Sequence, residues 1–169
     1  MSALNPRERL QPSLLDRLTD DEPGNPVDSP SNRTLSLAQL KASVLRDLTW
    51  LLNATSLWDK TAISHSETRA SVINYGLPAL AGQSISGIDV HALEGIIHQA
   101  IVAYEPRILP HTLQVRAQAA AYMNVNALSF EIEGDLWAQP VPLPLLLRTE
   151  LDLETGHMQL VQAGQRRHA

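Results

Sequence analysis

Residues 101–110 read Ile-Val-Ala-Tyr-Glu-Pro-Arg-Ile-Leu-Pro, and the spacing of the apolar residues changes at this point of the chain. Upstream, apolar residues recur at intervals of three and four; downstream, they alternate with polar residues. Proline lacks a backbone N–H and biases the residue before it towards an extended conformation. We therefore expect a helix to end near Tyr104 and the chain to leave Pro106 as a strand.

Glu105 and Arg107 stand on either side of Pro106. In an extended segment, residues two positions apart point to the same side, so both charges can face a common surface or hold each other indirectly. Two interpretations stay open. The charges form a structural ion pair that locks the corner between helix and strand, or Glu105, Pro106 and Arg107 form a contact site for another protein.

Three helix patterns precede this corner. Ser36 and Gln39 have the spacing of a capping box and open an amphipathic pattern that runs to about Asn53. A shorter helix is predicted from Ser64 to a stop at Gly76. In the first helix the predicted buried residues are Leu37, Leu40, Val44, Leu45, Leu48, Trp50, Leu51 and Leu52, and the predicted exposed residues are Gln39, Lys41, Ser43, Arg46 and Asp47.

The third helix is predicted to begin after Asp89, a suitable N-cap residue, and to run into the corner. Its predicted apolar face carries Val90, Leu93, Ile97, Ile101 and Tyr104.

Beyond the corner, residues 113–117 and 128–132 alternate between apolar and polar, which is typical of half-buried strands. Residues 143–153 and 157–162 give two further strand patterns. Helices first and strands afterwards predict an α+β domain over residues 34–163. We expect about three helices and a mostly antiparallel sheet of about four strands, with the helices on one side.

Residues 1–33 are predicted to be a flexible N-terminal tail, and residues 164–169 a C-terminal tail. Within the first tail, residues 10–19 form a leucine-rich docking segment, followed by a linker rich in Asp, Pro, Gly, Asn and Ser. Ser13 is a plausible helix start, and Leu14, Leu15 and Leu18 recur at helical spacing. So short a helix is not stable alone, so it docks either on its own domain or on another chain.

The composition narrows the class of function. The 169 residues carry a formal net charge of -5, so the chain has no basic surface of the kind that binds nucleic acid. There is no cysteine, hence no disulfide framework and no thiolate chemistry. No apolar run reaches the length of a membrane helix, and the N-terminus lacks a signal-peptide pattern. These features predict a cytoplasmic protein without direct membrane insertion.

His91, Glu94 and His98 share one face of the third predicted helix and could present two imidazoles and a carboxylate to a metal ion. No fourth ligand is evident, and such residues are ordinary on a solvated helix face. The chain also lacks a phosphate-binding glycine loop, a dinucleotide fingerprint and a zinc-protease motif. We therefore predict neither a metal site nor a cofactor.

Four motifs occur in a fixed order along the chain. They are Leu14-Leu15-Asp16-Arg17-Leu18; Ser43-Val44-Leu45-Arg46-Asp47-Leu48 with Trp50-Leu51-Leu52-Asn53; Ser71-Val72-Ile73-Asn74-Tyr75-Gly76-Leu77-Pro78; and Tyr104-Glu105-Pro106-Arg107-Ile108. In this order they resemble the TssE family of type VI secretion baseplate proteins, which is homologous to the baseplate wedge subunit of contractile-tail phages. The resemblance covers roughly residues 10–162.

The resemblance implies a structural subunit, not an enzyme, assembled at the cytoplasmic face of the inner membrane. Its implied partners are the wedge proteins TssF, TssG and TssK and the sheath proteins TssB and TssC. The family fold is similar to the interlocking module of the sheath, in which strands of neighbouring subunits complete one sheet. An open sheet edge in the C-terminal half would suit that role. Residues 14–18 would then dock on a wedge partner.

The family also carries an old lysozyme label, which implies a peptidoglycan hydrolase as the alternative function. Glu105, paired with Glu131 or Glu133, would supply the two carboxylates of a glycoside hydrolase. Arg107 stands two residues from Glu105 and favours its charged form, which disfavours Glu105 as a proton donor. Peptidoglycan also lies outside the compartment that the missing export signal suggests.

Overall fold

The computed structural model describes residues 13–19, 23–24, 35–57, 67–68, 71–82, 87–118, 127–138 and 141–162. The predicted tails, apart from residues 13–19 and 23–24, lie outside this described part of the chain. The helices are α1 (Leu14–Leu18), α2 (Leu37–Asn53), the 3-10 helix η3 (Val72–Asn74) and α4 (Val90–Tyr104); the strands are β1 (Gln114–Gln118), β2 (Ala127–Leu136), β3 (Leu143–Asp152) and β4 (Met158–Gln162).

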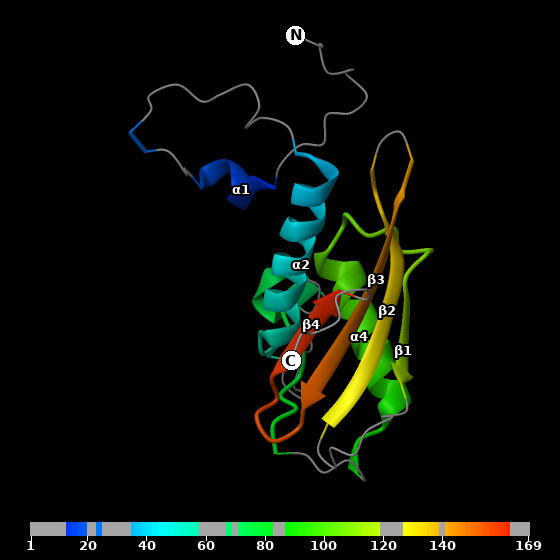
Figure 1. Ribbon diagram of the computed structural model, residues 1–169. Coiled ribbons are helices and arrows are strands. Elements are labelled where there is room, and N and C mark those ends of the chain that lie inside the picture. The colour runs from blue at the N-terminus through cyan, green and yellow to red at the C-terminus, as the bar shows by residue number, and fades with distance from the viewer. Residues whose placement is uncertain are drawn as a thin grey trace, which may run out of the picture.

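The four strands form one sheet in the order β1-β2-β3-β4, and every neighbouring pair is antiparallel. Helix α4 packs against β1, and α2 packs against β4 and α4. Figure 1 shows the long hairpin of β2 and β3 in the middle of the sheet, with α4 behind it and α2 along the β4 side. The predicted α+β class, with helices first and an antiparallel sheet afterwards, is confirmed.

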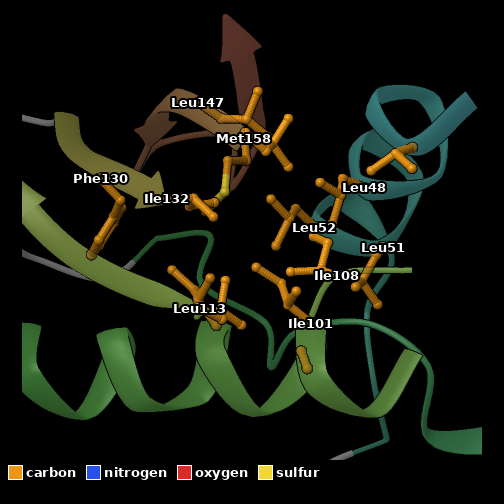
Figure 2. Packing of buried hydrophobic residues seen from close by; sticks show 14 of the residues in the cluster. Leu48, Leu51, Leu52, Ile101, Ile108, Leu113, Phe130, Ile132, Leu147 and Met158 are labelled. Carbon is orange, nitrogen blue, oxygen red and sulfur yellow. The ribbon is translucent and has the colours of Figure 1, made fainter. Parts of the chain in front are cut away.

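The core lies between the two long helices and the sheet (Figure 2). Along β3 the odd-numbered residues from Leu145 to Leu151 are buried and the even-numbered residues are exposed, as the alternating pattern predicts. The side chains with no exposed surface include Val44 and Leu48 of α2, Ile97 and Ile101 of α4, and Phe130, Ile132, Leu136, Leu147, Leu151 and Met158 of the sheet. The sheet therefore has one face against the helices and one face turned away from them.

Helix α2 begins at the predicted place. The Ser36 hydroxyl accepts the N–H of Gln39, and the Gln39 side chain accepts the N–H of Ser36, which closes the capping box. Three burial predictions for α2 are wrong. Leu37 and Trp50 are half-exposed, whereas Ser43 is buried. Figure 1 shows the first turn of α2 projecting above the end of β4.

Trp50 is exposed because it lies on the outer side of α2, where the guanidinium of Arg46 stacks 5.2 Å from its ring centroid. Ser43 is tolerated inside because its hydroxyl donates to the carbonyl of Leu40 at 3.0 Å.

Of the short helix predicted to end at Gly76, the described residues Glu67 and Thr68 are helical, Val72–Asn74 form the 3-10 turn η3, and Ile73 is exposed. Its predicted start, Ser64, lies outside the described residues. Gly76 has a positive φ of 116°, and a Cβ at this position would lie 2.3 Å from the carbonyl oxygen of Ala54. Only glycine allows the chain to pass so close to the end of α2.

Both edge strands are fastened to helices by side chains. On β1, the N–H of Ala117 donates to the carboxylate of Glu94 in α4 at 2.6 Å. On β4, the amide of Asn53 at the end of α2 accepts from the Met158 N–H at 2.9 Å and donates to the Met158 carbonyl at 2.8 Å. These contacts satisfy edge groups that would otherwise face solvent or another chain.

Candidate functional site

The corner after α4 is a turn. The N–H of Glu105 closes the last bond of α4, and the N–H of Ile108 donates to the carbonyl of Glu105 at 3.2 Å. The predicted helix end at Tyr104 is confirmed. The predicted departure as a strand is wrong, because β1 begins only at Gln114. The turn at Pro106 and Arg107 explains the difference. After it, Ile108 forms an isolated antiparallel bridge with Leu136 at the end of β2, and the N–H of Trp137 donates to the Arg107 carbonyl at 2.7 Å.

Glu105 and Arg107 bind each other directly. One carboxylate oxygen of Glu105 accepts the Arg107 backbone N–H at 3.2 Å and its Nε at 2.6 Å, while the other accepts Nη2 at 2.5 Å. The Glu105 side chain is only 3% exposed, whereas that of Arg107 is 22% exposed. The turn brings the two groups into a bidentate pair.

The pair continues into α2. Arg107 donates from Nη1 to the hydroxyl of Ser43 at 3.1 Å and from Nη2 to the carboxylate of Asp47 at 2.6 Å. Burial on its own would lower the pKa of Arg107, but the hydrogen bonds and charges of Glu105 and Asp47 outweigh that effect and raise it. Arg107 is therefore a permanent cation that joins the corner to α2.

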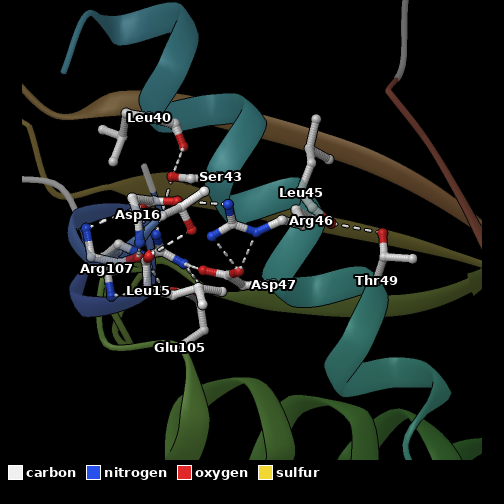
Figure 3. A network of polar contacts seen from close by, with 12 residues as sticks. Leu15, Asp16, Leu40, Ser43, Leu45, Arg46, Asp47, Thr49, Glu105 and Arg107 are labelled. Carbon is white, nitrogen blue, oxygen red and sulfur yellow. Dashed lines mark hydrogen bonds and ion pairs between the residues drawn. The ribbon is translucent and has the colours of Figure 1, made fainter. Parts of the chain in front are cut away.

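A second arginine extends the contacts to α1. Arg46 donates to Asp47 at 2.9 Å and, from Nη1, to Asp16 of α1 at 2.6 Å. Figure 3 shows the resulting row of charged side chains, which runs from Glu105 through Arg107, Asp47 and Arg46 to Asp16. Positive and negative groups alternate along the row, so every inner member has a partner on each side. We call this row the charged corner.

Helix α1 begins at Ser13 as predicted, and Ser13 and Asp16 form its capping box. Its polar side, not its apolar side, contacts the domain. Leu14, Leu15 and Leu18 are 70%, 44% and 74% exposed. The folded domain therefore holds the helix through the ion pair to Arg46 and leaves the leucines available.

The pKa of Asp16 reflects its contact with Arg46. Burial favours its neutral form, but the hydrogen bonds and charge of Arg46, with bonds from Ser13, outweigh burial and hold its pKa below the usual value. The Asp16–Arg46 contact is therefore strongest when Asp16 is charged.

The other candidate residues do not gather at one place. Glu131 and Glu133 lie on the face of the sheet away from the helices, since their neighbours Phe130 and Ile132 fill the core. Glu105 is buried on the helix side of the sheet. The carboxylate pair of a glycoside hydrolase is thus not assembled, and the donors of Arg107 already occupy the oxygens of Glu105.

Glu94 binds another element of the fold, whereas the His91 side chain is 94% exposed. One Glu94 oxygen accepts from Ala117 and the other lies 3.0 Å from Nδ1 of His91. The hydrogen bond from Ala117, followed by that from His91, lowers the pKa of Glu94, and the Glu94 contact raises the pKa of His91. Among the described residues, no group of three or more potential ligands has the arrangement of a metal site.

The sequence singles out Glu105 and Arg107 of the charged corner as site residues, but not its other members. Helical periodicity places Ser43, Arg46 and Asp47 on the solvent side of α2, yet Arg46 and Asp47 belong to the corner and Ser43 binds Arg107. Their spacing carried a signal: Ser43 and Asp47 are one helical turn apart, beside the apolar stripe, and so can face the same partner.

The fold is an antiparallel sheet backed by two helices, and the charged corner pairs its positive and negative groups with one another. The chain belongs to the family of the baseplate wedge protein gp25, a family that includes TssE, because the family model matches residues 38–141. Neither a curated protein nor a solved structure matches the chain. In the described part of the chain, no helix is both long and apolar enough to cross a membrane.

Proposed function

We propose that this chain is a TssE-type baseplate subunit of a type VI secretion system, which links the wedge proteins TssF, TssG and TssK to the TssB/TssC sheath at the cytoplasmic face of the inner membrane. The observation that carries the proposal is the presentation of α1. The helix turns its leucines away from the domain while Asp16 ties it to the charged corner. A subunit that joins two sets of partners needs such an outward apolar element on a rigid domain.

The leucines suit a wedge partner with an apolar helix-binding groove. Leu14 and Leu18 are four positions apart and therefore lie on one side of α1, which is the spacing of helix-in-groove recognition. The order imposed by the Asp16–Arg46 contact lowers the conformational entropy that α1 loses on binding.

Co-purification tests the wedge contact. The variant Leu14→Ser/Leu18→Ser should fold normally and lose TssF, TssG and TssK when these proteins are co-expressed. The matched control is Val72→Ser/Ile73→Ser, which removes two equally exposed apolar side chains of η3 elsewhere on the surface. If the parent recovers none of the wedge and sheath proteins, the proposal is wrong. If the leucine variant recovers the wedge proteins as well as the control does, the role of α1 is wrong.

The charged corner is proposed to support sheath attachment. Glu105, Pro106 and Arg107 lie at the turn, and Pro106 is exposed while Glu105 is not. Glu105→Gln and Arg107→Gln should each reduce recovery of TssB and TssC from a chain that circular dichroism shows to be folded. The outward backbone groups of Ala117 in β1 and Met158 in β4 already bind helix side chains. A sheath strand that joins the sheet must therefore pair at other outward groups of these strands, at Val115 of β1 or Leu160 of β4.

No feature of the charged corner favours peptidoglycan hydrolysis, since the Glu105 carboxylate has no path to a substrate in this conformation. The purified parent should not cleave peptidoglycan. Cleavage that disappears in a folded Glu105→Gln variant would replace the structural proposal with an enzymatic one.

A further inference from the structure

On the face of the sheet away from the helices, acidic and large apolar side chains lie near the β2–β3 hairpin. Glu133 and Asp135 of β2 point away from the core, and the alternation continues past the strand end: Leu136 is 0% exposed, Trp137 52% and Ala138 6%. Opposite them on β3 stand Leu146, the register partner of Glu133, and Pro144, the partner of Asp135. We call these five residues, Glu133, Asp135, Trp137, Pro144 and Leu146, the acidic-aromatic surface.

A depression borders four of these five residues, and Trp137 does not line it. The depression has a volume of about 460 Å³ and is lined by Glu133, Asp135, Pro144 and Leu146, together with Gly134, Leu145, Thr112 and Lys41. The described pairing of β4 with β3 runs from Leu151 to Leu147 and does not include Leu146 or Pro144, which line the hollow. Lys41 of α2 also lines the hollow. A single side chain, or a short extended segment, fits a space of this size.

The two carboxylates differ in their pairing from Glu131 on the same strand. Glu131, two residues before Glu133, has Arg148 at 3.5 Å. Among the described residues, neither Glu133 nor Asp135 has a cation within ion-pair distance, and Lys41 makes no such contact with them. Two like charges two positions apart on a strand repel each other, and both side chains are half-buried. A cation placed between them would relieve that repulsion.

We propose that the acidic-aromatic surface docks an arginine-bearing extended segment of a partner protein. A guanidinium can bind carboxylates through its paired N–H groups and stack on an indole at the same time, which a lysine ammonium does less well. Trp137 supplies the exposed ring beside the carboxylates, and Leu146 and Pro144 supply apolar contact on the other strand. This contact lies on the opposite side of the sheet from the charged corner, and it does not depend on which contractile machine the subunit serves.

Titration of the full-length protein with a synthetic peptide tests the proposal. The probe is acetyl-Gly-Leu-Arg-Leu-Arg-Leu-Gly-amide, in which the arginines are two positions apart like Glu133 and Asp135; a peptide with glutamate in place of arginine serves as the comparison. Amide chemical shifts should change at residues 133–137 and 144–146 with the arginine peptide alone. Glu133→Gln/Asp135→Asn should weaken binding by about tenfold or more, because two charge-assisted contacts are lost.

The matched control is Glu150→Gln/Glu154→Gln, which changes the net charge equally towards the other end of the sheet and should leave the affinity unchanged. Equal weakening in both variants would show a general charge effect and overturn the proposal, as would shift changes centred elsewhere. Residues 163–169 include Arg166 and Arg167. If a chain without residues 163–169 binds the peptide at least about tenfold more tightly, the chain's own tail is the occupant and the assignment to a partner protein is wrong.

Discussion

The two members of the buried ion pair should contribute unequally to stability. Arg107→Met leaves the Glu105 carboxylate, 3% exposed, without the Nε and Nη2 donors that now bind it. Removal of one partner of a buried pair costs about 3–5 kcal/mol, because the other charge stays buried and unpaired. Glu105→Gln leaves Arg107, which is 22% exposed and still bound to Asp47 at 2.6 Å. We expect this second change to cost about 1.5–3 kcal/mol, the range for lost hydrogen bonds to charged groups.

Urea unfolding followed by circular dichroism measures both costs, provided that the slope of free energy against urea stays the same. At about 3 °C per kcal/mol for a chain of this size, Arg107→Met should lower the melting temperature by roughly 9–15 °C. The double variant should be less destabilised than the sum of the single variants by about 0.5–3 kcal/mol, since both changes break one interaction. Equal costs or a reversed order would refute the unequal burial of the pair, and strict additivity would refute its direct coupling.

Three further changes test other parts of the structure. The pKa of Asp16 in the folded protein is held below its usual value of 3.8. The contribution of Asp16 to α1 docking should therefore be complete above pH 3.8 and lost as the pH falls through the folded-state pKa. NMR shifts of the α1 amides should follow this titration in the parent and not in Asp16→Asn. Gly76→Ala should cost more than the roughly 1–3 kcal/mol of a strained backbone, because its Cβ would meet the Ala54 carbonyl, whereas Gly82→Ala, with positive φ but open space, should cost only the strain. Phe130→Ala should lower the unfolding free energy by about 3–5 kcal/mol in urea titrations, and a loss below 1 kcal/mol would contradict its burial in the core.

The sequence by itself determined the elements, because their signals are local. The capping box at Ser36, the N-cap at Asp89 and the break at Pro106 act on neighbouring backbone groups, and each marks a helix end in the structure. The alternation from Leu113 onwards likewise reports which side of a strand is buried. The motif order also pointed to the family that the match over residues 38–141 confirms.

Only the tertiary structure decided which polar residues meet. Arg107 and Asp47 are 60 positions apart in the chain, and Asp16 and Arg46 are 30 apart, so no local pattern pairs them. Helical periodicity assigned Asp47 to solvent because a charged side chain beside an apolar stripe normally stays wet. The packing of α4 against α2 brought Arg107 to it and made the half-buried position favourable. The leucines of α1 show the reverse: their apolar spacing suggested a buried face, but the contact of Asp16 with Arg46 fixed the helix with those side chains outward.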